Sequence, residues 1–307
     1  MELERVVVHD SVDVIFEPSV LVAALSDLPV PVESPADPDL GPGDGVVAFG
    51  PHPSFLNAAW VHCIRAGYDE FAIDEYADAG VVLTNSTGIH GTAVGETVLG
   101  HLLTLARGIH TFRDRQRASE WEREPYGTLF TLDGERVCVV GLGTLGTGIA
   151  RRAAALGMDV VGVRRSGEPH DHARHVYTPD ELTRAVDGAR FVVLALPLTA
   201  ETEGLVSTAT FDAMDEQSFL VNVARGAVVD EDALVAALDA EAIAGAALDV
   251  FETEPLPPAS PLWDDDRVFV TPHTSAMHRR YHEDVATLVR TNVRRLRAGE
   301  DLTNRVV

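Results

Sequence analysis

Lysine is absent from this 307-residue sequence, so all 24 of its basic residues are arginines. They face 48 acidic residues, which leaves a formal net charge of -24. An excess of this size repels itself in dilute solution and destabilises the compact state. It also argues against binding to nucleic acid or an anionic membrane surface, because such partners require a positively charged face. We therefore expect neither nucleic acid nor membrane as a partner.

Cysteine and long hydrophobic runs are also scarce. The two cysteines, Cys63 and Cys138, lie in strand-like runs, and neither has a second cysteine at a metal-binding spacing. We expect buried, unreactive thiols and no metal site. No apolar run approaches the roughly 18 residues needed to cross a membrane. The acidic start, MELERVVVHD, is unlike a signal peptide, so we expect a soluble cytoplasmic protein.

Abundant acid without lysine is typical of proteins from salt-loving archaea. At 1 M salt the electrostatic screening length falls to about 3 Å, so the repulsion among the acids largely vanishes. The composition therefore favours a halophilic source, and an ordinary acidic protein from a mesophile is the alternative.

Short runs rich in valine and isoleucine alternate with helical patterns along most of the chain. RVVVHD, GVVAFG, VHCIRA and GVVLTN read as strands in the first 85 residues, and RVCVVG, DVVGVR, FVVLAL, SFLVNV, AGAALDV and RVFVTP follow later. Continuous apolar runs of this kind suit parallel strands that are covered on both faces. The pattern predicts an α/β protein with two doubly wound parallel-sheet domains.

Helical patterns separate these strands and set the expected domain order. AVGETVLGHLLTLARGIHTF predicts one long helix, and further helices are expected over 144–156, 230–240 and 275–298. A glycine-rich turn opens the second series of strands rather than the first. We therefore expect a Rossmann dinucleotide-binding domain at residues 96–274, inserted into a flavodoxin-like substrate domain made of residues 1–95 and 275–307.

The segment VVGLGTLGTGIA carries the pattern G-x-G-x-x-G at Gly141, Gly143 and Gly146. Such glycines allow a tight turn, the close approach of a pyrophosphate, and close packing of helix on strand. The helix that begins near Thr144 and Leu145 would point free N–H groups and its positive dipole end at the phosphates. Because the pattern follows a strand and opens a helix, we expect a dinucleotide site; a glycine turn without a ligand is the alternative.

The next strand, DVVGV, ends in Arg164, Arg165 and Ser166, where NAD-binding domains usually carry an acid. An acid would accept hydrogen bonds from the ribose hydroxyls and repel a 2′-phosphate. Two guanidinium groups and a hydroxyl would instead bind that phosphate, with charge-assisted hydrogen bonds worth roughly 1.5–3 kcal/mol each. The sequence therefore predicts NADP(H) as the cofactor, with NAD bound more weakly; solvated surface charges are the alternative.

Three segments just beyond predicted strand ends, VNVARGAVVD, LDVFETEPLP and TPHTSA, supply Arg225, Glu254 and His273. The carboxyl ends of the strands are where open α/β sheets bind ligands. A guanidinium can bind a substrate carboxylate through two parallel hydrogen bonds, and an imidazole can exchange a proton with the reacting oxygen. A carboxylate beside the imidazole favours its charged form. Singly, each residue reads as a surface charge or a packed histidine; together they predict a 2-oxo acid reductase.

In these motifs and their order, the sequence closely resembles the D-isomer-specific 2-hydroxyacid dehydrogenase family over nearly its whole length. The resemblance implies catalytic roles for the arginine, the glutamate and the histidine just named. LALPLTAETEGLV resembles the family's loop beside the cofactor, with Pro197 and Thr202, and Asp249 in LDVF resembles the acid that holds the nicotinamide carboxamide. IRAGYDEFAID resembles the substrate loop, where backbone N–H groups near Ala66 and Gly67 meet the carboxylate.

The resemblance also sets the expected partners and the alternatives. It implies a small 2-oxo acid or D-2-hydroxy acid as substrate, and a homodimer formed through the cofactor domains, for which DRQRASEWEREPYG is a candidate contact. The chain ends soon after its last helix, without the regulatory domain of many phosphoglycerate dehydrogenases. An NAD-linked phosphoglycerate-type dehydrogenase and a dinucleotide-sensing corepressor stay as alternatives. A formate dehydrogenase would carry glutamine at the position of Glu254, so this glutamate argues against that activity.

Overall fold

The computed structural model describes residues 3–307 and divides into two compact units. The chain passes from the first unit to the second and later returns to the first. One unit holds the chain up to Ile89 together with Met277–Val307, and the other holds His90–Ala276. From the sequence we expected the domain boundaries to follow residues 95 and 274. The first boundary lies earlier, because the helix that begins at Gly91 belongs to the second unit from its first turn. A Cβ added to Gly91 would lie 2.7 Å from the Thr144 carbonyl oxygen, which shows how closely this turn packs there.

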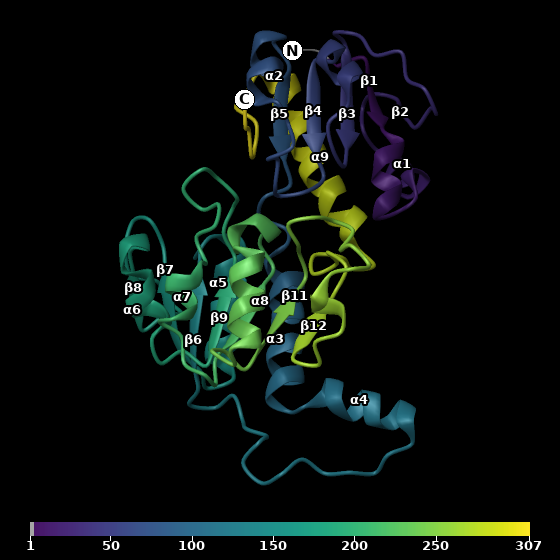
Figure 1. The fold of residues 1–307 in the computed structure, drawn as a ribbon. Helices are drawn as coiled ribbons and strands as arrows, with labels where there is room; N and C mark the ends of the chain where they lie inside the picture. Colours follow the sequence, from purple (N-terminus) through teal and green to yellow (C-terminus); the bar gives the residue numbers. More distant parts are fainter. Residues whose placement is uncertain (1–2) are drawn as a thin grey trace. The chain divides into compact units, whose positions relative to one another are not determined.

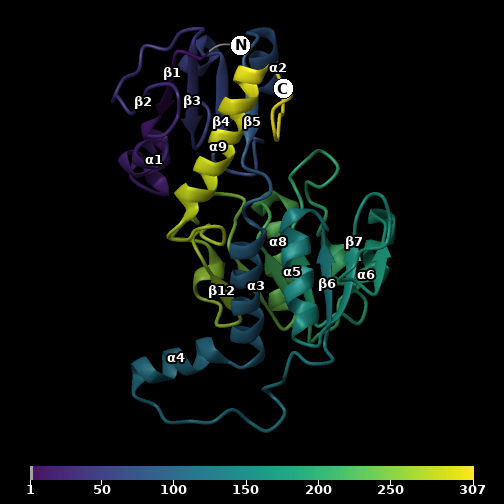
Figure 2. The same cartoon turned by 180° about the vertical axis from the view of Figure 1, so that it is seen from behind.

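Within the described residues, the first unit is built on a five-stranded parallel sheet. Its elements are β1 (Arg5–Val8), α1 (Pro18–Ala24), β2 (Val32–Glu33), β3 (Asp44–Ala48), β4 (Trp60–Cys63), α2 (Ile73–Asp78), β5 (Val82–Asn85) and α9 (Tyr281–Ala298). The strands lie in the order β2-β1-β3-β4-β5, and Figures 1 and 2 show α9 along one face of the sheet. The short strand β2 at the edge was not predicted, because two residues are too few to show a pattern.

The second unit is built on a seven-stranded parallel sheet. Its elements are α3 (Gly91–Ala106), α4 (Ile109–Ala118), β6 (Arg136–Val140), α5 (Thr144–Ala155), β7 (Asp159–Val163), β8 (His175–Tyr177), α6 (Leu182–Val186), β9 (Phe191–Leu194), α7 (Thr208–Phe211), β10 (Phe219–Asn222), α8 (Glu231–Asp239), β11 (Gly245–Leu248) and β12 (Val268–Val270). The strand order is β12-β11-β10-β9-β6-β7-β8. Figure 1 shows α7 and α8 on one face, and Figure 2 shows α3 and α5 on the other.

The strand order makes the second unit doubly wound, as predicted. The chain runs outward from β6 through β7 to β8, then returns to β9 on the other side of β6. The direction of winding therefore reverses between β6 and β9, and ligands bind at such a reversal in open α/β sheets. The glycine-rich turn follows β6 and so lies at this point. The predicted fold class, two parallel-sheet α/β domains of which one is a Rossmann domain, is confirmed.

Two helix predictions differ from the structure, one by an internal break and one in where the helix begins. The long helix predicted from AVGETVLGHLLTLARGIHTF is broken into α3 and α4, because Gly108 has a left-handed backbone with φ of 59°. The apolar spacing continues past this glycine, so the pattern alone did not reveal the break. The last helix begins at Tyr281 rather than at 275, because the segment before it is hydrogen-bonded to the loop after β11.

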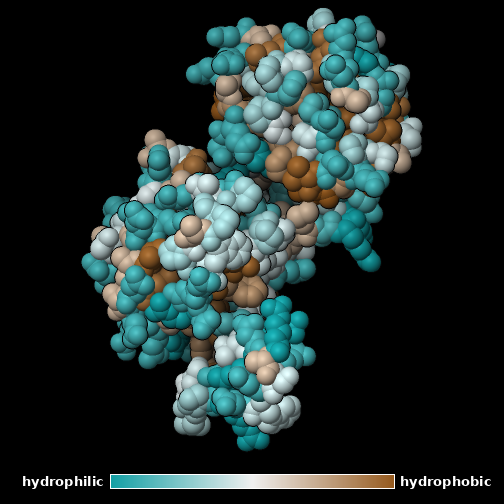
Figure 3. Space-filling view, turned by 45° about the vertical axis from the view of Figure 1, so that its right-hand side comes forward, coloured by the Kyte–Doolittle hydropathy of each residue, from teal (hydrophilic) through white to brown (hydrophobic). Residues whose placement is uncertain are grey.

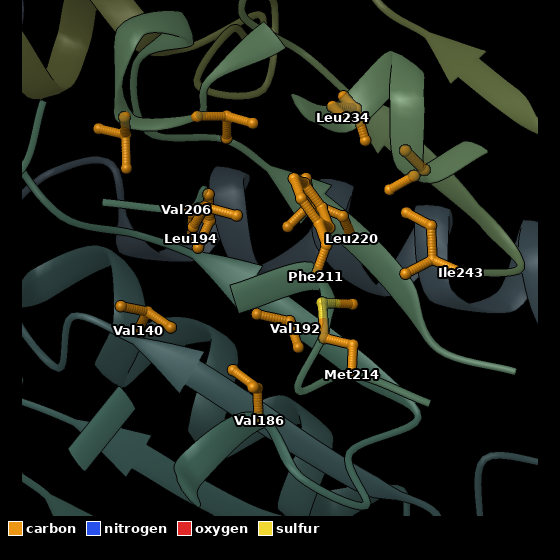
Figure 4. Packing of buried hydrophobic residues seen from close by; sticks show 14 of the residues in the cluster. Val140, Val186, Val192, Leu194, Val206, Phe211, Met214, Leu220, Leu234 and Ile243 are labelled. Carbon is orange, nitrogen blue, oxygen red and sulfur yellow. The ribbon is translucent and has the colours of Figure 1, made fainter. Parts of the chain in front are cut away.

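The strands of the second unit are buried on both faces by apolar side chains. Figure 4 shows one side, where Val192, Leu194 and Leu220 from β9 and β10 meet Phe211 and Leu234 from α7 and α8. Each of these five side chains is at most 2% exposed. The alternate strand residues pack against α3 and α5 on the opposite face. This two-sided burial explains why the strands read as continuous apolar runs in the sequence.

Both cysteines are buried and free, as predicted. Cys138 lies within β6, where burial raises the pKa of its thiol to about 12. Cys63 ends β4, and burial raises the pKa of its thiol as well. Both thiols are therefore protonated at neutral pH, and a protonated thiol is a poor nucleophile and metal ligand.

The visible surface is mostly hydrophilic, with hydrophobic residues gathered in smaller patches (Figure 3). The most exposed aromatic side chains, Trp121 and Tyr126, lie in the segment after α4 and have exposed fractions of 97% and 109%. Among residues 3–307, no helix has the length and the apolar composition needed to cross a lipid bilayer.

Candidate active site

The glycine-rich turn after β6 has the shape of a phosphate-binding turn. Gly141 has φ of 96°, and a Cβ there would lie 2.5 Å from a backbone carbonyl oxygen of the loop after β9. A Cβ on Gly146 would lie 1.7 Å from the Gly141 carbonyl oxygen, whereas one on Gly143 would meet no atom within 4 Å. Gly143 therefore borders open space at the start of α5, where Thr144 and Leu145 begin the helix. The residues present fit a pyrophosphate at this helix N-terminus.

A cavity of about 470 Å³ adjoins this turn within the second unit. Arg164, Arg165 and Ser166 follow β7 directly and line the cavity. Pro197 and Thr202, from the loop after β9, line it as well. The Thr202 hydroxyl donates to the Pro197 carbonyl oxygen at 2.7 Å, which holds this loop in its conformation. The cavity is thus lined both by the residues predicted to bind a 2′-phosphate and by the two residues of the loop predicted to lie beside the cofactor.

Two exposed acids lie near the arginines. Nη2 of Arg164 is 3.7 Å from the Glu168 carboxylate, whose side chain is 73% exposed. The pKa of the Glu201 carboxyl lies below its ordinary value, mainly because Thr199 donates a hydrogen bond to it, and Arg165 adds a weaker attraction. Exposed ion pairs of this kind contribute little free energy. Both arginines can therefore exchange these acids for a phosphate at small cost.

Glu254 and His273 form the closest polar contact among the predicted catalytic residues. Nδ1 of His273 is 2.7 Å from one oxygen of the Glu254 carboxylate, and the other oxygen accepts from the Phe251 N–H at 3.1 Å. Burial alone would raise the pKa of Glu254, but the hydrogen bond with His273 and the charge of Arg225 hold it below its ordinary value. The ionised carboxylate orients the imidazole through Nδ1, which leaves Nε2 to exchange a proton with a substrate.

Arg225 follows β10, and its backbone is held by a side chain that we did not predict. Asn222 ends β10 with 1% of its surface exposed, and its Nδ2 donates to the Arg225 carbonyl oxygen at 3.0 Å. A Cβ on Gly226 would lie 1.8 Å from the Phe251 carbonyl carbon, so only glycine lets this loop meet the loop that leads to Glu254. A polar residue at the end of an apolar strand was the available sequence signal for Asn222.

The loop that carries His273 is held by Asp249, which is 2% exposed. One carboxylate oxygen accepts from the Thr271 hydroxyl at 2.6 Å and from the Thr274 N–H at 3.0 Å, and the other accepts from the Ser275 N–H at 3.0 Å. The His273 N–H donates to the Asp249 carbonyl oxygen at 2.8 Å. These bonds hold His273 in the left-handed region, with φ of 51°. From sequence we expected a cofactor contact for Asp249, and Thr271 was not singled out.

Ala66 and Gly67 lie in the first unit, in the loop after β4. Among the described residues, no acceptor bonds to the backbone N–H of either one. The loop itself is fixed, because the Asn85 side chain donates to the Ala66 carbonyl oxygen at 2.7 Å. Two adjacent backbone N–H groups without an acceptor suit an anionic oxygen.

The second unit combines a doubly wound sheet, a glycine turn where the winding reverses, and an imidazole held by a carboxylate. This combination suits hydride exchange with a bound dinucleotide, and it defines the class of the protein as the dinucleotide-dependent oxidoreductases. The chain belongs to the D-isomer-specific 2-hydroxyacid dehydrogenase family. Residues 99–275 match the family model described as "D-isomer specific 2-hydroxyacid dehydrogenase, NAD binding domain". The predicted family is therefore confirmed, and the protein is an oxidoreductase that acts on 2-hydroxy acids and 2-oxo acids with a nicotinamide dinucleotide.

Three relatives place the chain within this family. It is 33% identical to glyoxylate/hydroxypyruvate reductase B of Pectobacterium carotovorum over 278 residues, which cover 86% of this chain and 85% of that protein. It is 37% identical to D-3-phosphoglycerate dehydrogenase 2 of Arabidopsis thaliana over 221 residues, which cover 72% of this chain but only 35% of the plant protein. A solved D-isomer-specific 2-hydroxyacid dehydrogenase from Xanthobacter autotrophicus Py2, in complex with NADPH and MES, is 34% identical with a TM-score of 0.84, covering 99% of this chain and 98% of that one.

Proposed function

We propose that this chain is an NADP-dependent reductase of small 2-oxo acids that produces, or in reverse oxidises, the D-isomer of the 2-hydroxy acid. The observation that carries the proposal is the 2.7 Å contact between His273 and Glu254, in the unit that also holds the glycine turn. The similarity to glyoxylate/hydroxypyruvate reductase B, which extends over most of both chains, supports a small 2-oxo acid as the substrate.

The proposed mechanism assigns one task to each polar group. When bound, the cofactor supplies or accepts a hydride at the substrate C2. His273 gives a proton from Nε2 to the substrate oxygen in reduction and takes it back in oxidation, and Glu254 stabilises the protonated ring. Arg225 binds the substrate carboxylate through two parallel N–H bonds. In the first unit, we assign a substrate-binding role to the backbone N–H groups of Ala66 and Gly67.

The cavity beside the glycine turn supports NADP rather than NAD as the preferred cofactor. Its edge carries two arginines and a hydroxyl where an acid would serve the ribose of NAD. The Xanthobacter relative, described as an NADPH complex, is consistent with this preference. We assign the cofactor contacts to Gly141, Gly143, Thr144, Leu145, Gly146, Arg164, Arg165, Ser166, Pro197, Thr202 and Asp249.

Turnover of 2-oxo acids and of phosphorylated substrates distinguishes the proposed reductase from two alternatives. Similarity to the plant D-3-phosphoglycerate dehydrogenase favours the phosphoglycerate-type alternative, but this chain covers only 35% of that protein. A corepressor on the same fold would bind the dinucleotide without turning over any 2-oxo acid.

Composition and surface support three further statements of the proposal. The 48 acids, 24 arginines and no lysine support an enzyme that works in the cytoplasm of a halophile. The exposed Ile109 and Phe112 of α4, with Trp121 and Tyr126 beyond it, support a homodimer formed through the cofactor units. α4 and the segment after it extend away from the sheet of their own unit (Figures 1 and 2), as an arm that covers a second copy would.

Purified protein should oxidise NADPH when glyoxylate or hydroxypyruvate is added, and NADPH should give a higher kcat/KM than NADH. Activity should rise steeply from dilute buffer to molar KCl, because salt screens the repulsion among the acids. The measurement is the loss of absorbance at 340 nm over a series of KCl concentrations. Dinucleotide binding without turnover would support the corepressor, NADH preference with phosphorylated substrates would support the phosphoglycerate-type enzyme, and equal activity in dilute buffer would contradict a halophilic enzyme.

Replacing Thr271 with valine should lower kcat about tenfold while the Kd for NADPH stays near its wild-type value. Valine keeps the shape but removes the 2.6 Å bond to Asp249, so the buried carboxylate loses a donor and the loop around His273 loosens. Thr271→Ser restores the hydroxyl and should restore kcat. Thr210→Val is the control, since it removes a hydroxyl of the same unit that bonds to the Leu205 carbonyl oxygen instead. If both valine variants lower kcat equally, the bond to Asp249 has no special role.

A further inference from the structure

Three arginines of α9 line a cavity in the first unit. Arg290, Arg294 and Arg297 recur at helical spacing, so they lie on one face of the helix. The cavity has a volume of about 510 Å³ and lies between this face and residues 27–29, which follow α1. Asp27 is the one acid among the described residues that line it, so three arginines and one aspartate give the lining a net charge of +2. The chain has 48 acids and 24 bases, so this basic cavity runs against its composition.

Arg290 joins the two walls of this cavity. Its Nε lies 3.0 Å from each carboxylate oxygen of Asp27, and its Nη2 donates to the carbonyl oxygen of Ala24, the last residue of α1. Val293, which also lines the cavity, is 1% exposed and belongs to the core of the unit. The turn after α1 is thereby held against α9, and the cavity is a fixed feature of this unit.

Arg294 and Arg297 carry the positive charge that remains available to a ligand. Both residues are exposed, and among residues 3–307 neither guanidinium has a hydrogen bond or an ion pair. A basic residue near the end of a helix often interacts with its last carbonyl groups. Here Arg295, which does not line the cavity, donates to the Asp301 carbonyl oxygen just beyond the helix at 2.7 Å. The two arginines of the cavity are therefore free to bind an anion.

The rest of the lining is apolar. Leu28 and Pro29 contribute from the turn after α1, and Val293 and Ala298 contribute from α9. Pockets that bind small molecules have this character, with mostly apolar walls, a few placed charges and volumes of roughly 300–1,000 Å³. A bare inorganic anion would leave the apolar walls without a partner. The cavity therefore suits an anion that carries an apolar body.

We propose that this cavity binds an organic phosphate, whose apolar substituent lies against the apolar walls while Arg294 and Arg297 bind the phosphate oxygens. A phosphate monoester carries a charge of about -1.5 to -2 at neutral pH, which matches the net charge of the lining. Guanidinium groups bind phosphate through parallel N–H bonds, and two of them on one helix face can bind different oxygens. A carboxylate offers the same groups one charge and two oxygens. The cavity lies within the first unit, so this inference goes beyond the proposed function and does not depend on it.

Phenyl phosphate, benzoate and inorganic phosphate test the site by isothermal titration calorimetry at one fixed concentration of KCl. Phenyl phosphate should bind to the wild type with a Kd at least about tenfold below those of the other two, because it alone combines an apolar ring with a dianion. The double variant Arg294→Gln with Arg297→Gln removes both charges and should raise this Kd at least about tenfold. Ala298→Glu keeps all three arginines but adds a carboxylate to the lining, and it should weaken binding to a similar extent.

Arg280→Gln is the matched control, since it removes an exposed arginine at the other end of α9, 3.8 Å from the Glu283 carboxylate. It should leave the Kd unchanged, and a melting temperature near that of the wild type shows that each variant folds. Absence of phenyl phosphate binding to the wild type would overturn the inference. An unchanged Kd in both cavity variants would also overturn it, because the probe would then occupy another anion site, and so would equal binding of benzoate or of inorganic phosphate. Turnover of 2-oxo acids tests the proposed function separately.

Discussion

Replacement of His273 with alanine should lower kcat for 2-oxo acid reduction by at least about 10²-fold, the usual scale for losing a general acid. The Kd for NADPH should change little, because the imidazole lies on the loop after β12 and does not line the cavity beside the glycine turn. Steady-state kinetics and a fluorescence titration with NADPH measure the two effects. A parallel loss of NADPH affinity would mean that the substitution disturbs the fold of the unit.

Glu254→Gln distinguishes a proton-exchanging imidazole from one that only packs. The ionised carboxylate, 2.7 Å from Nδ1, stabilises the protonated form of His273. Glutamine keeps the shape and removes the charge that stabilises the protonated ring. Reduction needs the protonated ring, so the reductive activity of Glu254→Gln should fall away at a lower pH than that of the wild type. An unchanged pH profile would assign Glu254 a purely structural role and would weaken the case for His273 as the acid.

Features with a local cause were predictable from the sequence. The strands were visible because parallel strands that are buried on both faces must be apolar throughout. The glycine turn was visible because Gly141 needs a positive φ and Gly146 has no room for a Cβ, and each requirement admits one residue type. The order of Arg225, Glu254 and His273 was visible because each follows a strand whose end could be located.

Features that depend on contacts between distant segments were not predictable. Asn222 and Thr271 are ordinary polar residues in the sequence, and only the fold brings Thr271 to within 2.6 Å of Asp249. The packing of His9 on His52 needs two strands to become neighbours, although their residues are far apart in the chain. The break at Gly108 depends on which glycine adopts a left-handed backbone, and spacing does not determine that choice.

Replacing both Arg164 and Arg165 with alanine should raise the KM for NADPH by about a hundredfold or more, and the KM for NADH should change little. Two charge-assisted hydrogen bonds at roughly 1.5–3 kcal/mol each set this scale, because NADH has no 2′-phosphate for the arginines to bind. The measurement is kcat/KM for both cofactors at one fixed molar concentration of KCl, since salt screens exposed ion pairs. Equal losses with both cofactors would place the arginines at the shared pyrophosphate.

Two acids near the arginines affect the expected loss of NADPH binding. Glu168, 3.7 Å from Arg164, and Glu201, which lines the same cavity, stay behind in the double variant and add repulsion against a phosphate. If each arginine alone can still neutralise these acids, the free energy of NADPH binding lost in the double variant should exceed the sum of the losses in the two single variants. If both arginines bind the same phosphate oxygens, the loss in the double variant should be smaller than that sum. Glu168→Gln is the matched control, because it removes an acid and should not weaken NADPH binding.

Arg164→Asp should go further than alanine and reverse the preference. An aspartate at the end of β7 would repel the 2′-phosphate and accept hydrogen bonds from the ribose hydroxyls of NADH, so one substitution adds a penalty for one cofactor and a contact for the other. The residual Arg165 limits the reversal, and the variant that also replaces Arg165 should complete it. A wild-type enzyme that already prefers NADH would contradict this assignment, because the two arginines would then be surface charges in a chain whose only cations are arginines.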